Sequence, residues 1–197
     1  MSDAPDAEPA AAPSAEPSAG SSAEQTAEPA AGPSPQQAAE LIRQTLAEAE
    51  LQFDEPSPGT FVANLPGQKR LKTSCWLIVG SQGLAVEAFV MRRPDENAGA
   101  VHRWLLAHNA RMFAVSWAID DAGDVYLTGR LPLAAVTAEV IDRLLGSVLD
   151  YADSAFNTLL EIGFGSSIRR EWAWRESRGE SLANLAAFEG FVRRSSS

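Results

Sequence analysis

The residues best suited to metal or acid–base chemistry are few and poorly spaced for it. The chain has two histidines, His102 and His108, and one cysteine, Cys75. Metal-binding pairs on a helix lie three or four residues apart, whereas these histidines are six apart, about 120° from each other around a helix. Cys75 lies in a stretch of alternating apolar residues, which favours a small buried side chain over a reactive thiol. We expect His108 to be a core-edge histidine bonded to the backbone, and no metal or cofactor to be bound.

Motifs that would indicate catalysis are equally scarce. The sequence contains no GxxxxGK[ST], no GxGxxG after a strand, no GxSxG and no HExxH. Asp120, Asp121 and Asp124 surround Gly123 without the spacing of a calcium loop, so they indicate a hairpin turn. A hydrolase or transferase would need titratable residues clustered in one cleft, and the sequence indicates no such cluster. We therefore predict no catalytic residues and a protein that is not an enzyme.

Two polar stretches are candidates for contact with a partner. In 92–97, two arginines precede Pro-Asp-Glu-Asn, which suits either a grip on a partner's carboxylate or backbone, or a capped junction with internal ion pairs. In 168–175, the spacing of the two tryptophans places their rings on different sides of a helix. One ring is then exposed as an interface anchor, or packs under a C-terminal segment near Leu182, Leu185 and Phe188. The candidate partner-binding residues are Arg92, Arg93, Arg169, Arg170, Trp172 and Trp174.

Composition limits the possible partners and compartments. With 26 acidic and 16 basic residues the net charge is −10, which disfavours nucleic acid as a partner because phosphate binding needs a basic surface. One cysteine allows no disulfide within the chain. No apolar run approaches the roughly 20 residues of a membrane span, and the first residues lack the pattern of a secretory signal. We expect a soluble, cytoplasmic protein with no membrane insertion.

The first 35 residues differ from the rest. Ala, Pro and Ser fill most of 1–35, which holds six acidic residues, no basic residue and no Leu, Ile, Val, Phe, Trp or Tyr. Such a segment cannot bury enough apolar surface to offset its ordering entropy. We predict a disordered tail over 1–35, an α+β domain over 36–180 and a weakly helical C-terminal extension over 181–197.

The remaining pattern predicts an α+β fold. Alternating apolar residues indicate strands, a period near 3.6 indicates helices, and Gly-Ser-Gln-Gly at 80–83 indicates a hairpin turn. The helix after the third strand is expected to begin at Pro94, with Asp95 and Glu96 in its first turn, and Gly163-Phe164-Gly165 should break the long helix. The prediction is a five-stranded antiparallel sheet in the order α-β-β-β-α-β-β-α, with a C-terminal helical extension. The expected helices are 37–51, 94–109, 137–162 and 166–178, and the expected strands are 60–65, 70–79, 84–91, 112–119 and 124–130.

Two stretches, Pro58–Leu133 and Phe156–Gly179, resemble the YbjN domain family in the form common in high-GC Gram-positive bacteria. The first contains PGTFVANLPGQKRLKTSCWLIVGSQGLAVEAFVMRRPDEN and the second FNTLLEIGFGSSIRREWAWRESRG. The family carries the label of sensory transduction regulator, and its fold is similar to that of type III secretion chaperones, which bind extended segments of other proteins and often dimerise. No catalytic residues are carried over.

The resemblance implies a function in binding rather than in catalysis. We expect a non-enzymatic protein-binding module of the chaperone or adaptor type, with a protein partner and a possible homodimer. The alternative is a small-molecule or signal-sensing regulatory domain. That alternative needs a ligand site between the sheet and a helix.

Overall fold

The structure is a computed structural model, and it describes residues 32–194. Residues 1–31 and 195–197 of the predicted tail and extension therefore lie outside the described residues. In chain order the elements are α1 (Pro35–Glu48), β1 (Gln52–Ser57), β2 (Thr60–Pro66), β3 (Lys72–Val79), β4 (Gly83–Met91), α2 (Ala98–Asn109), β5 (Ser116–Ile119), β6 (Val125–Pro132), η1 (Leu133–Ala135), α3 (Ala138–Arg178), η2 (Ala183–Phe188) and α4 (Glu189–Arg194).

The predicted α+β class is confirmed, but the sheet has six strands and not five. Its order is β1-β2-β3-β4-β6-β5, and every neighbouring pair is antiparallel. The missed strand is β1, because Pro56, Pro58 and Gly59 read as a break between elements. Proline is tolerated there since β1 lies at the sheet edge, where its pairing with β2 is irregular between Asp54 and Ser57.

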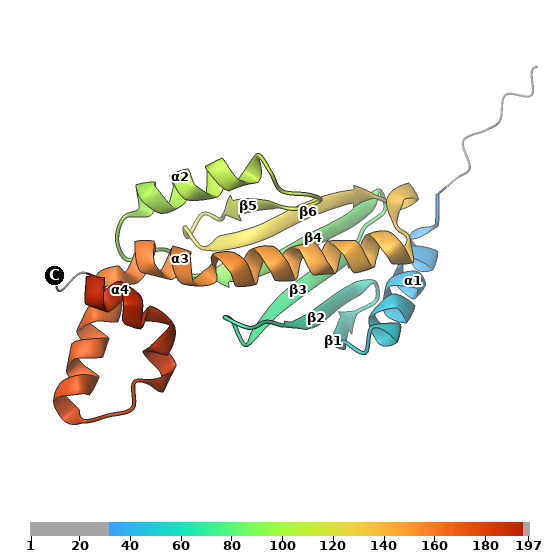
Figure 1. Cartoon of the computed structure of the whole chain (residues 1–197). Coiled ribbons are helices and arrows are strands. Elements are labelled where there is room, and N and C mark those ends of the chain that lie inside the picture. The colour runs from blue at the N-terminus through green and yellow to red at the C-terminus, as the bar shows by residue number, and fades with distance from the viewer. Residues whose placement is uncertain (1–31, 195–197) are drawn as a thin grey trace, which may run out of the picture. The chain divides into compact units, whose positions relative to one another are not determined.

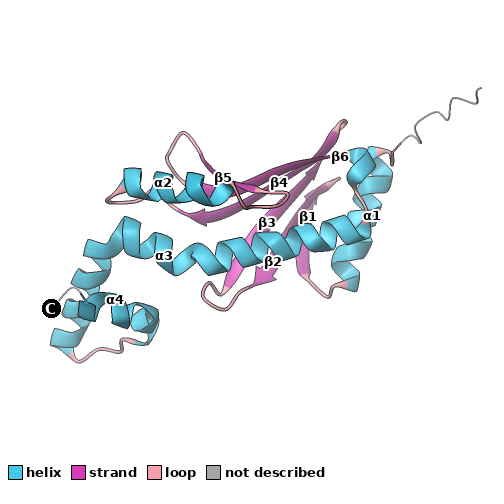
Figure 2. Cartoon of the chain, turned by 45° about the horizontal axis from the view of Figure 1, so that its top comes forward, coloured by secondary structure: helices cyan, strands magenta, loops and turns pink. Residues whose placement is uncertain are grey.

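One face of the sheet forms the core with the helices. A row of five buried side chains crosses five strands and consists of Ala63, Cys75, Ala88, Leu127 and Trp117. The first three of these side chains are small. The long helix α3 lies close to β2, β3 and β4 and buries the leucines Leu144, Leu145 and Leu159. Figures 1 and 2 show α1, α2 and α3 on the same side of the sheet.

Local capping explains where the two long helices begin. Ser34 and Gln37 form a capping box at the start of α1, each side chain accepting from the other's backbone N–H. Thr137 caps α3 as predicted, because its hydroxyl accepts from the Val140 N–H at 3.2 Å. The predicted break in α3 is present as a kink, since Phe164 has non-helical φ and ψ of −139° and 15°.

The start of α2 differs from the prediction. The helix begins at Ala98, after Asn97 with its left-handed φ of 53°, and not at Pro94. The N–H groups of Asp95 and Glu96 instead donate to the carbonyl of Gly163 at 3.0 and 3.1 Å. The two acids therefore connect the β4–α2 segment to the kink of α3 rather than filling a first helical turn.

Candidate partner-binding surfaces

Arg92 lies in an internally paired junction, as the capped-junction interpretation expects. Its guanidinium donates two hydrogen bonds to the Asp95 carboxylate, at 2.6 and 2.8 Å. It also lies over the Phe164 ring, with its Cζ 4.4 Å from the ring centroid. This ion pair lowers the pKa of Asp95, and the positive charge of Arg170 acts in the same direction. Arg92 is thus held by residues of its own chain.

The kink of α3 is capped by a residue from the other predicted stretch. Glu96 accepts hydrogen bonds from both the backbone N–H and the hydroxyl of Ser166, each at 2.6 Å. These bonds lower the pKa of Glu96, and the charges of Arg169 and Arg170 lower it further. The second half of α3 therefore begins with an acid at its N-terminal end, where the helix dipole favours negative charge.

The structure brings three of the six predicted residues together. Arg92, Arg169 and Arg170 surround the two acids at the kink, although they come from stretches more than 70 residues apart. Arg170 also donates to the Ser167 hydroxyl at 3.0 Å, and Arg169 lies over the Phe191 ring at 5.0 Å. The cluster ties α3 to its surroundings and to the C-terminal segment.

Arg93 lies apart from that cluster. Its backbone N–H donates to Asp124 Oδ1 at 2.7 Å, and its side chain covers the β5–β6 turn. A Cβ atom at Gly123 would lie 2.9 Å from Arg93 Cγ and Cδ, and that glycine has a φ of 86°. Arg93 thus packs against the predicted hairpin turn.

The two tryptophans lie in different environments, as their spacing predicts. Trp172 is half-buried, whereas 46% of Trp174 is exposed. The Arg178 guanidinium lies over the Trp174 ring at 5.0 Å. Trp174 is therefore a large surface aromatic next to a cation, a combination that is common in protein interfaces.

The outer face of the sheet carries an apolar surface that the sequence analysis did not identify. Trp76 and Phe89 are 42% and 37% exposed, and Phe89 meets Tyr126 edge to face with ring centroids 5.5 Å apart. The sequence could have indicated this surface, because β3 and β4 carry apolar residues on both of their faces instead of one. We call this surface the open sheet face and define it as Val62, Trp76, Ile78, Ala85, Phe89 and Tyr126.

The centre of the open sheet face carries a negative charge, whereas the exposed Arg130 lies opposite Ala85 toward one end of it. Glu87 is exposed and lies directly opposite Trp76 in the β3–β4 pair. Burial raises the pKa of the Tyr126 hydroxyl, and the nearby Asp120, Asp124 and Glu87 raise it further. A partner that complements this surface would combine apolar side chains with a basic one.

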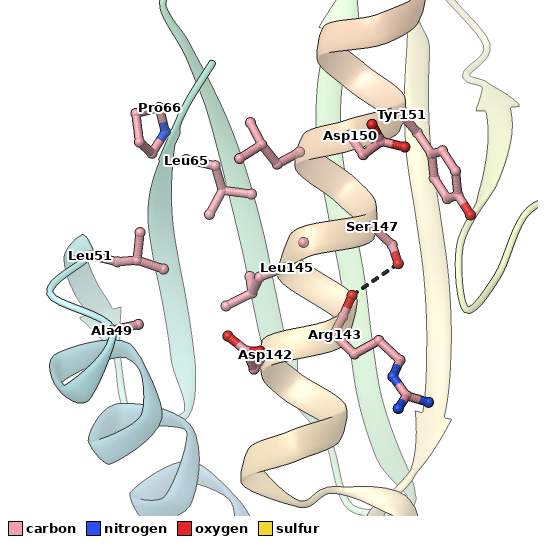
Figure 3. Close-up of a pocket in the computed structure, with 12 residues that line it drawn as sticks. Ala49, Leu51, Leu65, Pro66, Asp142, Arg143, Leu145, Ser147, Asp150 and Tyr151 are labelled. Atoms are coloured by element: carbon pink, nitrogen blue, oxygen red, sulfur yellow. Dashed lines mark hydrogen bonds between the residues drawn. The ribbon is translucent and has the colours of Figure 1, made fainter. Parts of the chain in front are cut away.

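A groove of about 570 Å³ runs along α3 on the helical side of the sheet. Figure 3 shows Leu51, Leu65 and Pro66 across from Leu145 of α3, with Asp142 also on the α3 side. Its lining includes the exposed Gly146, where an added Cβ would have no atom within 4 Å. The groove is a second apolar surface, and it contains fewer aromatic residues than the open sheet face.

The remaining residues that could do chemistry are in unreactive settings. Cys75 is fully buried, and burial raises the pKa of its thiol to about 12. His108 stacks on Trp104, with Nδ1 2.7 Å from the Trp104 carbonyl oxygen, which confirms the predicted bond to the backbone. The predicted place at the core edge is wrong, because the His108 side chain is exposed. Over residues 32–194, no three His, Cys, Asp or Glu side chains are grouped to hold a metal ion. No helix in that range is long and apolar enough to cross a membrane.

Comparison with known proteins identifies a family. Residues 38–161 match the model of the YbjN family, described as "Putative bacterial sensory transduction regulator". An uncharacterised protein of Mycobacterium leprae is 55% identical over 131 residues, which cover 66% of this chain and 71% of that protein. An uncharacterised protein of Mycobacterium tuberculosis is 48% identical over 153 residues, which cover 75% of this chain and 84% of that protein.

Solved structures show weaker likenesses. The ExsC–ExsE complex contains a chain with a TM-score of 0.45 and 20% identity, and the match covers 61% of this chain and 92% of that one. Escherichia coli YbjN gives a TM-score of 0.45 and 15% identity, covering 60% and 87% respectively. TM-scores below 0.5 are too low to transfer a partner or a binding site from one chain to another.

Proposed function

Since the chain belongs to the YbjN family, we propose that it is a non-enzymatic protein-binding module of the adaptor or chaperone type. The family description names regulation of sensory transduction and no chemical reaction. We place the partner on the open sheet face, and the observation that carries this proposal is the uncovered aromatic surface around Trp76 and Phe89.

An uncovered apolar sheet face needs a partner for a physical reason. Antiparallel sheets with one solvated face normally place polar side chains on that face. Here Trp76, Phe89 and Tyr126 occupy it instead, on strands at the centre of the sheet. Contiguous apolar surface with a polar rim is typical of protein interaction sites.

The charge on this face indicates the chemistry of the partner. Glu87 is exposed and lies between Trp76 of β3 and Thr128 of β6 in the register of the sheet. We propose that the partner contributes a segment whose apolar side chains cover Trp76 and whose Lys or Arg meets Glu87.

The residues predicted from the sequence form a second contact in this proposal. Trp174 has the largest exposed aromatic surface among them, so it is the one that we propose touches the partner directly. The paired arginines Arg92, Arg169 and Arg170 hold the kink of α3 and thereby position Trp174. Arg93 contributes at the rim of the β5–β6 turn.

Site-specific photo-cross-linking tests the proposal in cells that make the full chain. A photoreactive phenylalanine replaces Trp76 or Trp174, and the matched control replaces Leu106, an exposed apolar residue of α2. We expect position 76 to cross-link to an apolar, basic segment of one other protein, with Glu87→Lys abolishing that product and position 106 giving none. Cross-links from position 76 to a second copy alone would overturn the proposal in favour of a homodimer face.

One observation favours the second candidate function, a domain that senses a small molecule. The seam between α3 and the centre of the sheet is filled by buried side chains, which leaves no ligand space there. At the end of the sheet, however, the chain has an apolar cavity that contains Arg70, for which residues 32–194 supply no carboxylate partner.

A further inference from the structure

A shallow pocket of about 350 Å³, which is open to solvent and is called the cavity below, lies where the end of β4 meets α3. This volume is at the small end of the range for ligand sites, about 300–1,000 Å³. Six of its eight lining residues are apolar and three are phenylalanines, while the other two are arginines. The lining is Arg70, Phe89, Val90, Met91, Arg92, Phe156, Leu160 and Phe164.

Arg70 is held in the wall of this cavity by the backbone of β4. Strands β3 and β4 pair as far as Cys75 and Ala88, and beyond that point Arg70 Nη1 donates to the carbonyls of Phe89 and Val90 at 2.8 and 2.7 Å. The guanidinium lies 5.7 Å from the Phe89 ring centroid and 5.5 Å from that of Phe156. These contacts fix the side chain before any ligand arrives.

The positive charge of Arg70 has no counter-ion among residues 32–194. No carboxylate in that range forms an ion pair with it, and Asp153 accepts only from its backbone N–H. Burial lowers the pKa of Arg70, with no acid acting in the opposite direction. Arg92, the other arginine of the cavity, is neutralised by Asp95.

The cavity therefore offers one unpaired positive charge and apolar walls. Nε and Nη2 of Arg70 form no hydrogen bond within the described range, and the two groups form the planar fork that matches a carboxylate. A partly desolvated charge gains more from an anion than an exposed one does. A single carboxylate matches one unpaired charge, and the phenylalanine-rich walls match a short apolar body.

We propose that this cavity binds a small monocarboxylate with an apolar body. The carboxylate accepts from Arg70 Nε and Nη2, and the apolar body packs against Phe156 and Leu160. This inference gives the second candidate function a site and a ligand class, and it does not depend on the protein-binding proposal.

Titration of the full chain with octanoate and with octan-1-ol, followed by NMR, tests the inference. The probes share their apolar body, so a difference between them reports the carboxylate alone. We expect octanoate to bind at least tenfold more tightly than octan-1-ol and to shift the Nε–H signal of Arg70. Equal affinity for the two probes, or shifts confined to other parts of the chain, would overturn the proposal.

Two variants locate the effect in this cavity. Arg70→Met should bring the octanoate and octan-1-ol affinities within about twofold of each other, whereas Leu160→Trp should weaken both by filling the cavity. The matched control is Arg143→Met, because Arg143 stacks on Phe113 and pairs with Glu139 outside the cavity. A tenfold preference for octanoate that persists in folded Arg70→Met would refute the assignment to Arg70.

Discussion

Asp153 of α3 anchors the β2–β3 loop, and its removal gives a quantitative test of this structure. Its Oδ1 accepts from the backbone N–H groups of Lys69 and Arg70 at 2.8 and 2.9 Å. Hydrogen bonds to a charged group contribute about 1.5–3 kcal/mol each when shielded from water. Asp153 is partly exposed, so solvent screening reduces the expected total to about 1 kcal/mol for Asp153→Asn, which keeps the shape and removes the charge.

The pH dependence of this effect has a defined sign. Burial raises the pKa of Asp153, but the backbone donors of residues 68–70 and the charge of Lys69 outweigh it and lower the pKa overall. A lowered pKa in the folded state means that the stabilisation is complete above the unfolded value of about 3.9 and is lost as pH falls through the folded value. The difference in free energy of unfolding between wild type and Asp153→Asn should therefore be largest near pH 7 and should shrink below about pH 4.

Urea denaturation followed by circular dichroism measures the effect. A loss of about 1 kcal/mol corresponds to a midpoint shift of roughly 0.5 M at the urea slope of a domain of this size. Asp150→Asn is the matched control, since Asp150 is an exposed acid on the same helix that accepts no side-chain hydrogen bond in the described range. The reasoning fails if the two variants are equally stable at pH 7, or if the Asp153→Asn difference is the same at pH 3 as at pH 7.

Two further predictions follow from single residues. Gly146→Ala should raise the free energy of unfolding by up to about 1 kcal/mol, because this position is exposed, lies in the middle of a helix and has free space around an added Cβ. Thermal unfolding measures the effect, and a lower melting temperature than that of the wild type would contradict the open geometry. Gly83→Ala is the contrasting variant, because its Cβ would lie 2.4 Å from the Leu131 carbonyl oxygen, and it should destabilise. Cys75 should react with a thiol reagent at pH 8 only at the rate of unfolding, and fast labelling of the native chain would show that the thiol is accessible.

Strands β2 and β4 and the break in α3 were predictable because their causes are local. Alternation with period two marks β2 and β4 in any context, and the two glycines flanking Phe164 favour a helix break. The first strand was missed because its prolines are allowed only at a sheet edge, and a sequence does not reveal which strand lies at the edge.

The start of α2 shows where local rules stop working. Asp95 and Glu96 have the composition of a first helical turn, yet their N–H groups bond to Gly163 and their carboxylates to Arg92 and Ser166. Tertiary hydrogen bonds replace the local cap, so the helix begins at Ala98. The same long-range contacts join the two polar stretches, and no spacing in the sequence could have indicated that meeting.

The sequence contains a signal for the open sheet face, because strands β3 and β4 carry apolar residues on both of their faces. Period-two reasoning assigns one apolar face to the core and treats the other face as solvated, so Trp76 and Phe89 were not weighed. Folding requires only the buried face, because exposed side chains add little hydrophobic stabilisation. We propose that contact with another molecule explains the aromatic residues of the outer face, and that an apolar segment with a basic residue for Glu87 is the best match.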